Sequence, residues 1–373
     1  MGDEGGRLAT SPGFSGGFFR PTPVDGRARL AKHGRGRAPM PENDFQTRIT
    51  RLFGIRHPVL AGGLMWLSDA PYVAAVVNAG GMGFITSRSS ATPAEFEAQL
   101  ARCAALTAGK PFGVNLSTSR HTAVPLMAYL DAALAAGVRH FETAGRAPAD
   151  DLIRRIRGAG GMVIHKVPLL RHALTAERLG VDAVAIVGME CGGHPGANTD
   201  MPAMLGGALA ASRLTIPYAI GGGIGHGAQI LAALAVGADA VVIGTRFLAG
   251  TEISAHPNYK ARMVEAGEDD HTLCFANNPG LGGAWRVLNN ATAREVRARE
   301  AAGRTGHADF AELTRGTLQK HAAYEQGDVE AGMLSMGPAV AFIDRVEPIA
   351  AIMTRLMGEA AAARHRLATL TRS

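Results

Sequence analysis

The sequence has few aromatic residues, few cysteines and no long hydrophobic run. Aromatic residues make up 5% of the 373 residues, too few for an aromatic-rich recognition surface. The three cysteines, Cys103, Cys191 and Cys274, lie far apart, so they form neither a disulfide framework nor a paired zinc motif. We therefore expect a reducing cytoplasm. No apolar stretch reaches the roughly 18 residues of a membrane-spanning helix, so we expect a soluble protein.

Apolar and small residues are abundant. Residues of the hydrophobic class make up 47% of the chain and charged residues only 19%, which excludes a wholly disordered protein. There are 48 glycines, and alanine dominates the apolar residues. This composition favours a large core in which helices pack closely on strands.

The net charge of +6 is concentrated near the N-terminus. Residues 1–40 hold six arginines and one lysine against three acidic residues, and thus account for +4. The same segment has nine glycines and four prolines and lacks the apolar core of a secretory signal. We predict a disordered tail over residues 1–44. The rest of the chain is nearly neutral, so neither nucleic acid nor membrane is expected as a partner.

From Pro58 onwards, short apolar runs alternate with longer Ala- and Leu-rich segments, the pattern of parallel βαβ units. The predicted strands are residues 58–61, 82–85, 112–116, 139–143, 162–167, 183–187, 216–220 and 240–243. The predicted helices are residues 70–78, 93–106, 125–136, 148–157, 170–179, 202–212 and 225–236. Glycines directly after several helices support these ends.

Eight strands with seven intervening helices favour a closed (β/α)₈ TIM barrel over a Rossmann sheet, which normally has six strands and an early glycine motif. We assign the barrel core to residues 45–250. Residues 251–335 break the pattern and are interpreted as an inserted lid-like helical segment with two helices, the alternative being a long solvated excursion. Residues 336–373 are predicted to form a closing C-terminal helix that packs on the barrel.

Two glycine-rich turns follow the last two predicted strands: Gly221, Gly222 and Gly223 after the seventh, and Gly244 with Thr245 after the eighth. Phosphate groups commonly bind at this position in such barrels. Free backbone N–H groups at Gly223, Gly225 and Thr245 would form an anion site. Simple tight turning is the alternative, and we favour a phosphate site because the two turns occur together.

The loop after the sixth predicted strand contains Gly192, Gly193 and His194. A histidine there faces the same barrel mouth and can exchange a proton near neutral pH. We therefore predict that His194 is catalytic rather than structural. Cys191 in the same loop is interpreted as a small filler, because the Gly-Ser before and the Thr after the cysteine of IMP-dehydrogenase-like barrels are absent.

Two further polar residues lie near strand ends. Asn115 offers a donor and an acceptor to a heterocyclic ring edge. Lys166 faces either the mouth or solvent, depending on register, and in the mouth it would suit the N1–C2 edge of a reduced flavin or an anionic substrate. Its neighbour His165 is expected to face the helix layer.

These motifs together resemble the nitronate monooxygenase family, formerly called 2-nitropropane dioxygenases. The resemblance covers about residues 49–356. It is carried by Pro58-Val-Leu-Ala-Gly-Gly-Leu-Met65, Asn115, His165-Lys166, Glu190-Cys-Gly-Gly-His-Pro-Gly196, Gly221-Gly-Gly-Ile224 and Gly244-Thr-Arg-Phe247. FMN-dependent enoyl-acyl-carrier-protein reductases are similar at the same places, including Ala255-His-Pro-Asn-Tyr-Lys260. The first-strand loop departs from the family pattern, because it lacks a Gln-Ala-Pro-Met run.

The resemblance implies FMN bound without a covalent link in the barrel mouth. The implied binding residues are Ala61, Gly62, Gly63, Asn115, Lys166, Gly192, Gly193, Gly221, Gly222, Gly223, Gly244 and Thr245, with His194 as the catalytic residue and no metal. The implied reaction oxidises a nitronate with O₂ to a carbonyl compound and nitrite. The alternatives are an FMN- and NAD(P)H-dependent enoyl-thioester reductase and a flavin-binding protein without turnover. The expected partners are the small-molecule substrate and O₂, and a homodimer is left open.

Overall fold

The protein is built around a closed barrel of eight parallel strands in sequential order, as the sequence predicts. The computed structural model describes residues 45–118, 126–196, 200–276, 278 and 283–370. The tail predicted for residues 1–44 lies outside this described part. The strands are β1 (Val59–Ala61), β2 (Met82–Thr86), β3 (Gly113–Ser117), β4 (His140–Ala144), β5 (Met162–Val167), β6 (Ala183–Val187), β7 (Tyr218–Gly221) and β8 (Ala240–Val242).

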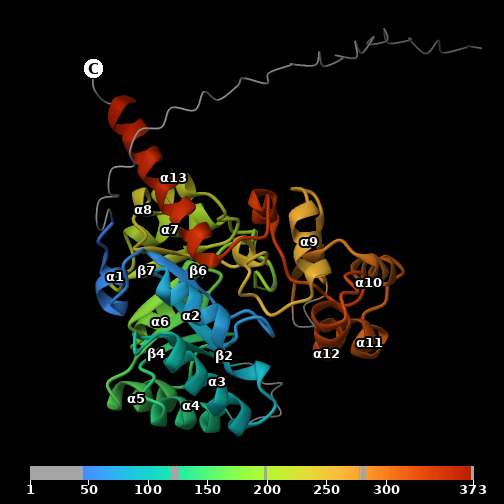
Figure 1. Cartoon of the computed structure of the whole chain (residues 1–373), viewed down its shortest axis with the longest axis horizontal. Helices are drawn as coiled ribbons and strands as arrows, with labels where there is room; N and C mark the ends of the chain where they lie inside the picture. Colours follow the sequence, from blue (N-terminus) through green and yellow to red (C-terminus); the bar gives the residue numbers. More distant parts are fainter. Residues whose placement is uncertain (1–44, 119–125, 197–199, 277, 279–282, 371–373) are drawn as a thin grey trace, which may run out of the picture. The chain divides into compact units, whose positions relative to one another are not determined.

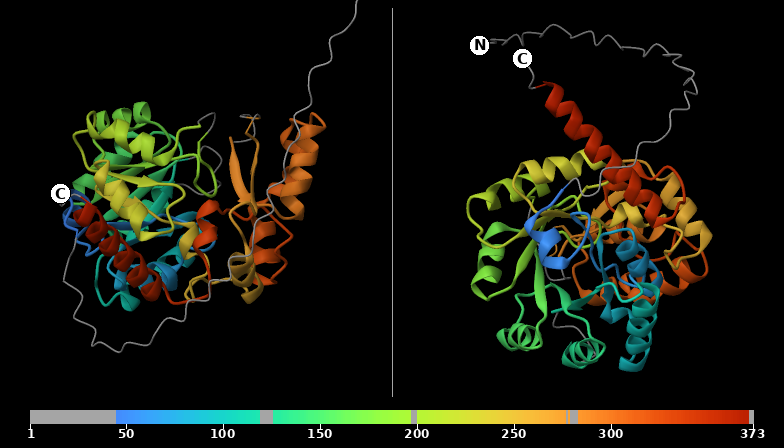
Figure 2. Two further views of the ribbon diagram at one scale, coloured as in Figure 1. Left: turned by 90° about the horizontal axis from the view of Figure 1, so that it is seen from above. Right: turned by 60° about the vertical axis from the view of Figure 1, so that its left-hand side comes forward.

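A helix follows each of the first seven strands, and the helices surround the strands (Figure 2). They are α2 (Ala70–Asn78), α3 (Pro93–Leu106), α4 (Leu126–Ala135), α5 (Asp150–Gly158), α6 (Leu170–Arg178), α7 (Ala203–Ala211) and α8 (Gly227–Ala235). The bounds differ from the predicted ones by at most two residues. For example, α8 begins at Gly227 because His226 is its N-cap and accepts a hydrogen bond from the Ala228 N–H.

Alternate strand residues face the barrel interior, and the register fixes which ones. Asn115 of β3 lies opposite Glu142 of β4, and Glu142 lies opposite Ile164 of β5. Ile164 packs in the interior cluster with Leu60 and Phe84, whereas the neighbours of Glu142 on β4 do not belong to that cluster. The two-residue period therefore places Asn115, Glu142 and Lys166 on the interior side of the barrel wall.

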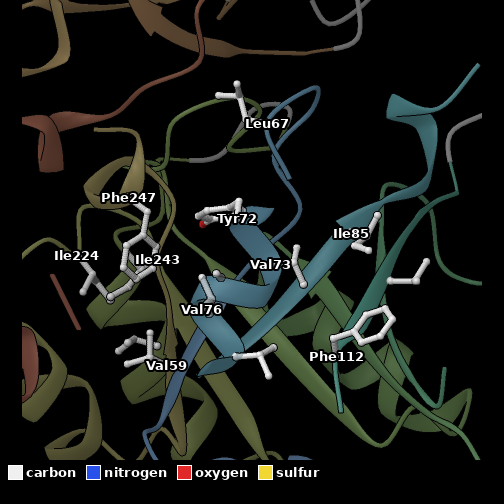
Figure 3. Packing of buried hydrophobic residues seen from close by; sticks show 14 of the residues in the cluster. Val59, Leu67, Tyr72, Val73, Val76, Ile85, Phe112, Ile224, Ile243 and Phe247 are labelled. Atoms are coloured by element: carbon white, nitrogen blue, oxygen red, sulfur yellow. The ribbon is translucent and has the colours of Figure 1, made fainter. Parts of the chain in front are cut away.

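The N-terminal end of the barrel is closed by α1 (Arg48–Phe53). The Phe53 ring meets Phe84 edge to face at 6.3 Å and lies 5.5 Å from the ring of His140, the first residue of β4. On the outer side, Val73 and Val76 of α2 pack towards the strands (Figure 3). The C-terminal strand ends are thus left as the end where a site can form.

Residues 251–335 contain more structure than the two helices expected for them. The segment holds a two-stranded antiparallel sheet of β9 (His271–Cys274) and β10 (Trp285–Leu288), and its helical elements gather together (Figure 1). These elements are α9 (Pro257–Glu265), α10 (Ala291–Ala301), η4 (His307–Asp309), α11 (Ala311–Thr314), α12 (Gly316–Leu318) and the π-helix η5 (Gln319–Glu325).

The chain then passes through η6 (Pro338–Phe342) to α13 (Ile349–Leu370), which packs on α8 and α2. The first half of α13 is buried at Ile352, Met353 and Leu356, and it takes the place of the eighth barrel helix. In the part of the chain that the structure describes, no helix has the length and hydrophobicity needed to cross a bilayer.

Candidate active site at the C-terminal end of the barrel

All thirteen residues predicted for the site lie at C-terminal strand ends or in the segments that follow them. Ala61 and Gly221 are the last residues of β1 and β7, Asn115 and Lys166 lie near the ends of β3 and β5, and Thr245 begins η2 (Thr245–Phe247). The others follow β1, β6, β7 and β8. One end of the barrel therefore carries the whole predicted set.

The turns after β7 and β8 present unpaired backbone donors. Among the residues that the structure describes, no acceptor is bonded to the backbone N–H groups of Gly222, Gly223, Gly244 or Thr245. Unpaired N–H groups gathered at one place form an anion site. The expectation for Gly225 is wrong: its N–H donates to Gln229 Oε1 at 2.9 Å, because this side chain caps the start of α8.

The glycines of the first of these turns are required by backbone geometry. Gly222 has φ 117° and Gly223 has φ 67°, both in the region that side chains disfavour. A Cβ on Gly223 would also approach Glu190 Cβ to 3.2 Å. Glycine therefore allows the tight turn that exposes the two N–H groups.

Glycines after β1 leave room for polar side chains of the barrel wall. A Cβ on Gly63 would lie 2.6 Å from Asn115 Cγ, and a Cβ on Gly62 would lie 3.0 Å from Glu142 Oε1 and 3.2 Å from Lys166 Nζ. The distance at Gly63 is too short for a real Cβ contact, and the two at Gly62 are tighter than most such contacts. The loop after β1 thus packs directly against Asn115, Glu142 and Lys166.

The sequence analysis missed Glu142, although it lies among the predicted residues. Its side chain is 2% exposed and accepts hydrogen bonds from Asn115 Nδ2 at 2.5 Å and from the Gly63 N–H at 3.0 Å. Lys166 Nζ lies 3.2 Å from its other oxygen. The available signal was an acidic residue at an interior position of a buried strand, which is rare without a partner.

The sequence left open whether Lys166 faces the barrel mouth or solvent, and the alternation of side chains along β5 decides this. Lys166 faces Glu142 on the interior side. His165 is turned the other way, where it is buried and its Nδ1 lies 2.8 Å from Thr143 Oγ1. Burial lowers the pKa of His165 to about 4, so it stays neutral, as expected for a residue of the helix layer.

His194 contacts two consecutive residues, Ala284 just before β10 and Trp285, the first residue of β10. Its Nδ1 lies 3.2 Å from the carbonyl oxygen of Ala284, and its ring lies 4.7 Å from the Trp285 ring, tilted by 34°. A carbonyl oxygen only accepts, so Nδ1 carries the proton and Nε2 is the acceptor nitrogen of the neutral ring. Neither Ala284 nor Trp285 was predicted, because their role depends on a contact between distant segments.

His194 is reached by solvent, although protein atoms pack around its ring. The residue is exposed to solvent. Protein atoms nevertheless surround it closely enough that burial lowers the pKa of its imidazole below the ordinary value. The neutral ring is therefore favoured near neutral pH and can be reached.

The β9–β10 hairpin is attached to the loop that carries His194. Gly193 and Arg286 exchange both backbone hydrogen bonds, at 2.9 and 2.7 Å. The Arg286 side chain, 8% exposed, donates from Nε and Nη2 to the carbonyl oxygen of Met189, and its Nη1 lies 3.0 Å from His271 Nδ1. The hairpin thus fixes both ends of the segment from Met189 to His194.

Cys191 fits the interpretation as a small filler. Burial raises the pKa of its thiol to about 12, so it is protonated at neutral pH and is a poor nucleophile. The described residues contain no cluster of histidine, cysteine and acidic side chains that could bind a metal ion.

The sequence model of the nitronate monooxygenase family matches residues 46–359. The chain belongs to this family. The match includes every predicted site residue and agrees with the resemblance inferred from the motifs.

Individual relatives carry different names. The chain is 35% identical over 228 residues to (3aS,4S,5R,7aS)-5-hydroxy-7a-methyl-1-oxo-octahydro-1H-indene-4-carboxyl-CoA dehydrogenase of Mycobacterium tuberculosis, which covers 60% of this chain and 62% of that protein. It is 30% identical over 263 residues to nitronate monooxygenase of Pseudomonas aeruginosa, covering 58% and 73%. The match thus spans less than two thirds of the first relative's length.

Among solved structures, FabK from Thermotoga maritima superposes with a TM-score of 0.77 at 30% identity, covering 87% of this chain and 99% of that one. The likeness therefore includes both the barrel and most of the segment after β8. The family and these relatives support an FMN-dependent oxidoreductase, and they leave the substrate open.

The donors present fit FMN. A phosphate dianion needs several N–H donors without a competing acceptor, and the turns after β7 and β8 supply four of them. A flavin ring needs a polar edge contact, and Asn115 and Lys166 lie on the interior side at the same barrel end.

Proposed function

We propose that the protein is an FMN-dependent nitronate monooxygenase, which oxidises alkyl nitronates with O₂ to a carbonyl compound and nitrite. The observation that carries this proposal is the state of His194, an exposed residue whose Nδ1 is bonded to the Ala284 carbonyl, so that Nε2 is the acceptor nitrogen of the neutral ring. Family membership supports the same reaction class.

The binding residues would each contribute a separate interaction. The N–H groups of Gly222, Gly223, Gly244 and Thr245 would bind the phosphate, and Lys166 would face the flavin edge that becomes negative on reduction. Bound FMN supplies the electron acceptor that the side chains lack. Ala61, Gly62, Gly63, Gly192, Gly193 and Gly221 would let the backbone approach it closely.

His194 would serve in one of two ways, depending on the form of the substrate. Towards a neutral nitroalkane, Nε2 would accept the proton from the carbon next to the nitro group. Towards a nitronate anion, the ring would take up a proton and become a cation that holds the anion in place, because a nearby negative charge favours the charged imidazole. Orientation over the flavin would then supply much of the rate.

The direct test uses the FMN-loaded protein in air with propionate 3-nitronate or an alkyl nitronate. Atoms and charge balance when two nitronate anions and one O₂ give two carbonyl compounds and two nitrite ions. We expect nitrite release that depends on FMN and falls in His194→Asn. FMN-loaded protein that releases no nitrite from either nitronate would contradict the proposal.

A carboxyl-CoA thioester is the second candidate substrate class. It is favoured by the 35% identity to the Mycobacterium tuberculosis dehydrogenase whose name includes such a group. Rapid NAD(P)H consumption with crotonyl thioesters and no nitrite from nitronates would favour thioester chemistry. Residues 41–373 carry a net charge of only about +2, which gives little support to an acidic carrier protein as the partner.

A further inference from the structure

Glu142 joins three segments of the barrel end through one carboxylate. One oxygen accepts from Asn115 Nδ2 of β3 and from the Gly63 N–H after β1, and the other oxygen pairs with Lys166 of β5. The side chain is 2% exposed, so these contacts replace almost all of its hydration. In the part of the chain that the structure describes, Lys166 is its only ion-pair partner.

The pair lies against the backbone that leads into the proposed flavin site. A Cβ at Gly62 would come within 3.2 Å of both Glu142 Oε1 and Lys166 Nζ, so the two groups are packed under this loop. Lys166 is 21% exposed, while Glu142 is almost fully covered. The ammonium group is therefore the member of the pair that remains accessible.

We propose that Glu142 is a positioning residue that directs Lys166 and offsets its charge, and thereby sets the reduction potential of the bound flavin. This inference rests on the proposed function, because it requires FMN in the barrel end. It concerns a residue that neither the motifs nor the family match singles out.

The expected direction follows from the charge that flavin gains on reduction. A reduced flavin carries negative charge at its N1–C2 edge, so a nearby cation stabilises the reduced form and raises the potential. A carboxylate 3.2 Å from the Lys166 ammonium cancels part of that effect. With the pair intact, the potential should therefore be lower than Lys166 alone would give.

The test compares FMN-loaded wild type, Glu142→Gln and Lys166→Met. Two quantities are measured: the flavin midpoint potential and the dissociation constant for sulfite, which forms a bond to N5 with its lone pair and leaves negative charge at N1–C2. Glu142→Gln should raise the potential and tighten sulfite binding about tenfold. Lys166→Met should lower the potential and weaken sulfite binding.

The opposite signs separate an electrostatic role from a structural one, because simple damage to the site would move both variants in the same direction. Shifts of the same sign, or unchanged values in Glu142→Gln, would overturn the inference. If Glu142→Gln does not fold, Glu142→Asp replaces it, and a smaller shift of the same sign is expected as the carboxylate withdraws from Lys166. Wild type that binds no FMN would instead overturn the proposed function.

Discussion

At the scale of single residues, the state of His194 depends on two neighbours, Ala284 just before β10 and Trp285 at its start. The Ala284 carbonyl selects the tautomer with an unprotonated Nε2, and Trp285 crowds one face of the ring. Burial accordingly lowers the pKa of the imidazole. In the proposed reaction, the neutral ring can accept a proton at neutral pH without first losing one.

This pKa shift predicts a pH dependence for oxidation of a neutral nitroalkane. The neutral imidazole predominates above its lowered pKa, so kcat/KM should be flat near neutral pH and fall at a lower pH than an ordinary imidazole would give. Trp285→Ala should let water reach the ring and move the acidic limb of the profile to higher pH. An identical limb in both proteins, measured from pH 4.5 to 8, would show that His194 does not control it.

Local sequence patterns were enough to select His194 and the glycines as predicted site residues. They did not reveal the contacts that these residues make with distant segments. A histidine between glycines after a strand is visible as a local pattern. Glu142 is a single acidic residue inside a strand, and its meaning appears only when the register brings Asn115 and Lys166 beside it. Trp285 is 91 residues away from His194, so no local pattern joins them.

At the scale of elements, the turn after β7 should control FMN affinity through its backbone. Gly223→Ala would force a side chain into the left-handed region, at a cost of roughly 1 kcal/mol, and against Glu190. We expect the FMN dissociation constant to rise about tenfold or more as the turn shifts.

The matched control for this turn is Gly137→Ala. Gly137 has a similar φ of 83° but has no atom within 4 Å of the added Cβ. This variant should lose stability by a similar amount in thermal unfolding while keeping its FMN affinity. Equal loss of FMN affinity in the two variants would count against a phosphate site at Gly223.

The β9–β10 hairpin should affect turnover more than cofactor binding. Arg286→Met removes the donors to the Met189 carbonyl and loosens the loop that carries His194. We expect kcat/KM to fall about tenfold, because misplaced reacting groups are costly, with FMN affinity nearly unchanged. The exposed Arg294→Met serves as the control and should retain full activity. Parallel loss of FMN affinity and activity in Arg286→Met would argue against this role.

The order of elements was predictable because each strand is a short apolar run and several helices end at glycine. The free backbone donors in the loops between these elements were not predictable, since side chains can bind the same N–H groups that a ligand would need. Gln229 bonds to the Gly225 N–H that the pattern assigned to an anion. Among the described residues, the donors of this turn without an acceptor are Gly222 and Gly223, of which only Gly223 was expected. The hairpin after α9 was missed because its two strands mix polar and apolar residues and do not stand out as apolar runs.

At the scale of the whole molecule, FMN should stabilise the fold through the turns after β7 and β8, where we propose that its phosphate binds. A ligand at one hundred times its dissociation constant adds about 2.7 kcal/mol. FMN should therefore raise the Tm of the apoprotein by several degrees, and riboflavin, which lacks the phosphate, should raise it much less. Equal shifts from both ligands would place the main binding energy outside these turns.

The most direct test of the account is an anaerobic titration of the FMN-loaded protein with propionate 3-nitronate, followed by flavin absorbance. We predict that the yellow colour of the wild type fades as the nitronate is added. His194→Asn should keep its FMN but react about a hundredfold more slowly, because the anion is no longer held over the flavin. A wild type that stays yellow at saturating nitronate, or a His194→Asn variant that fades at the wild-type rate, would contradict it.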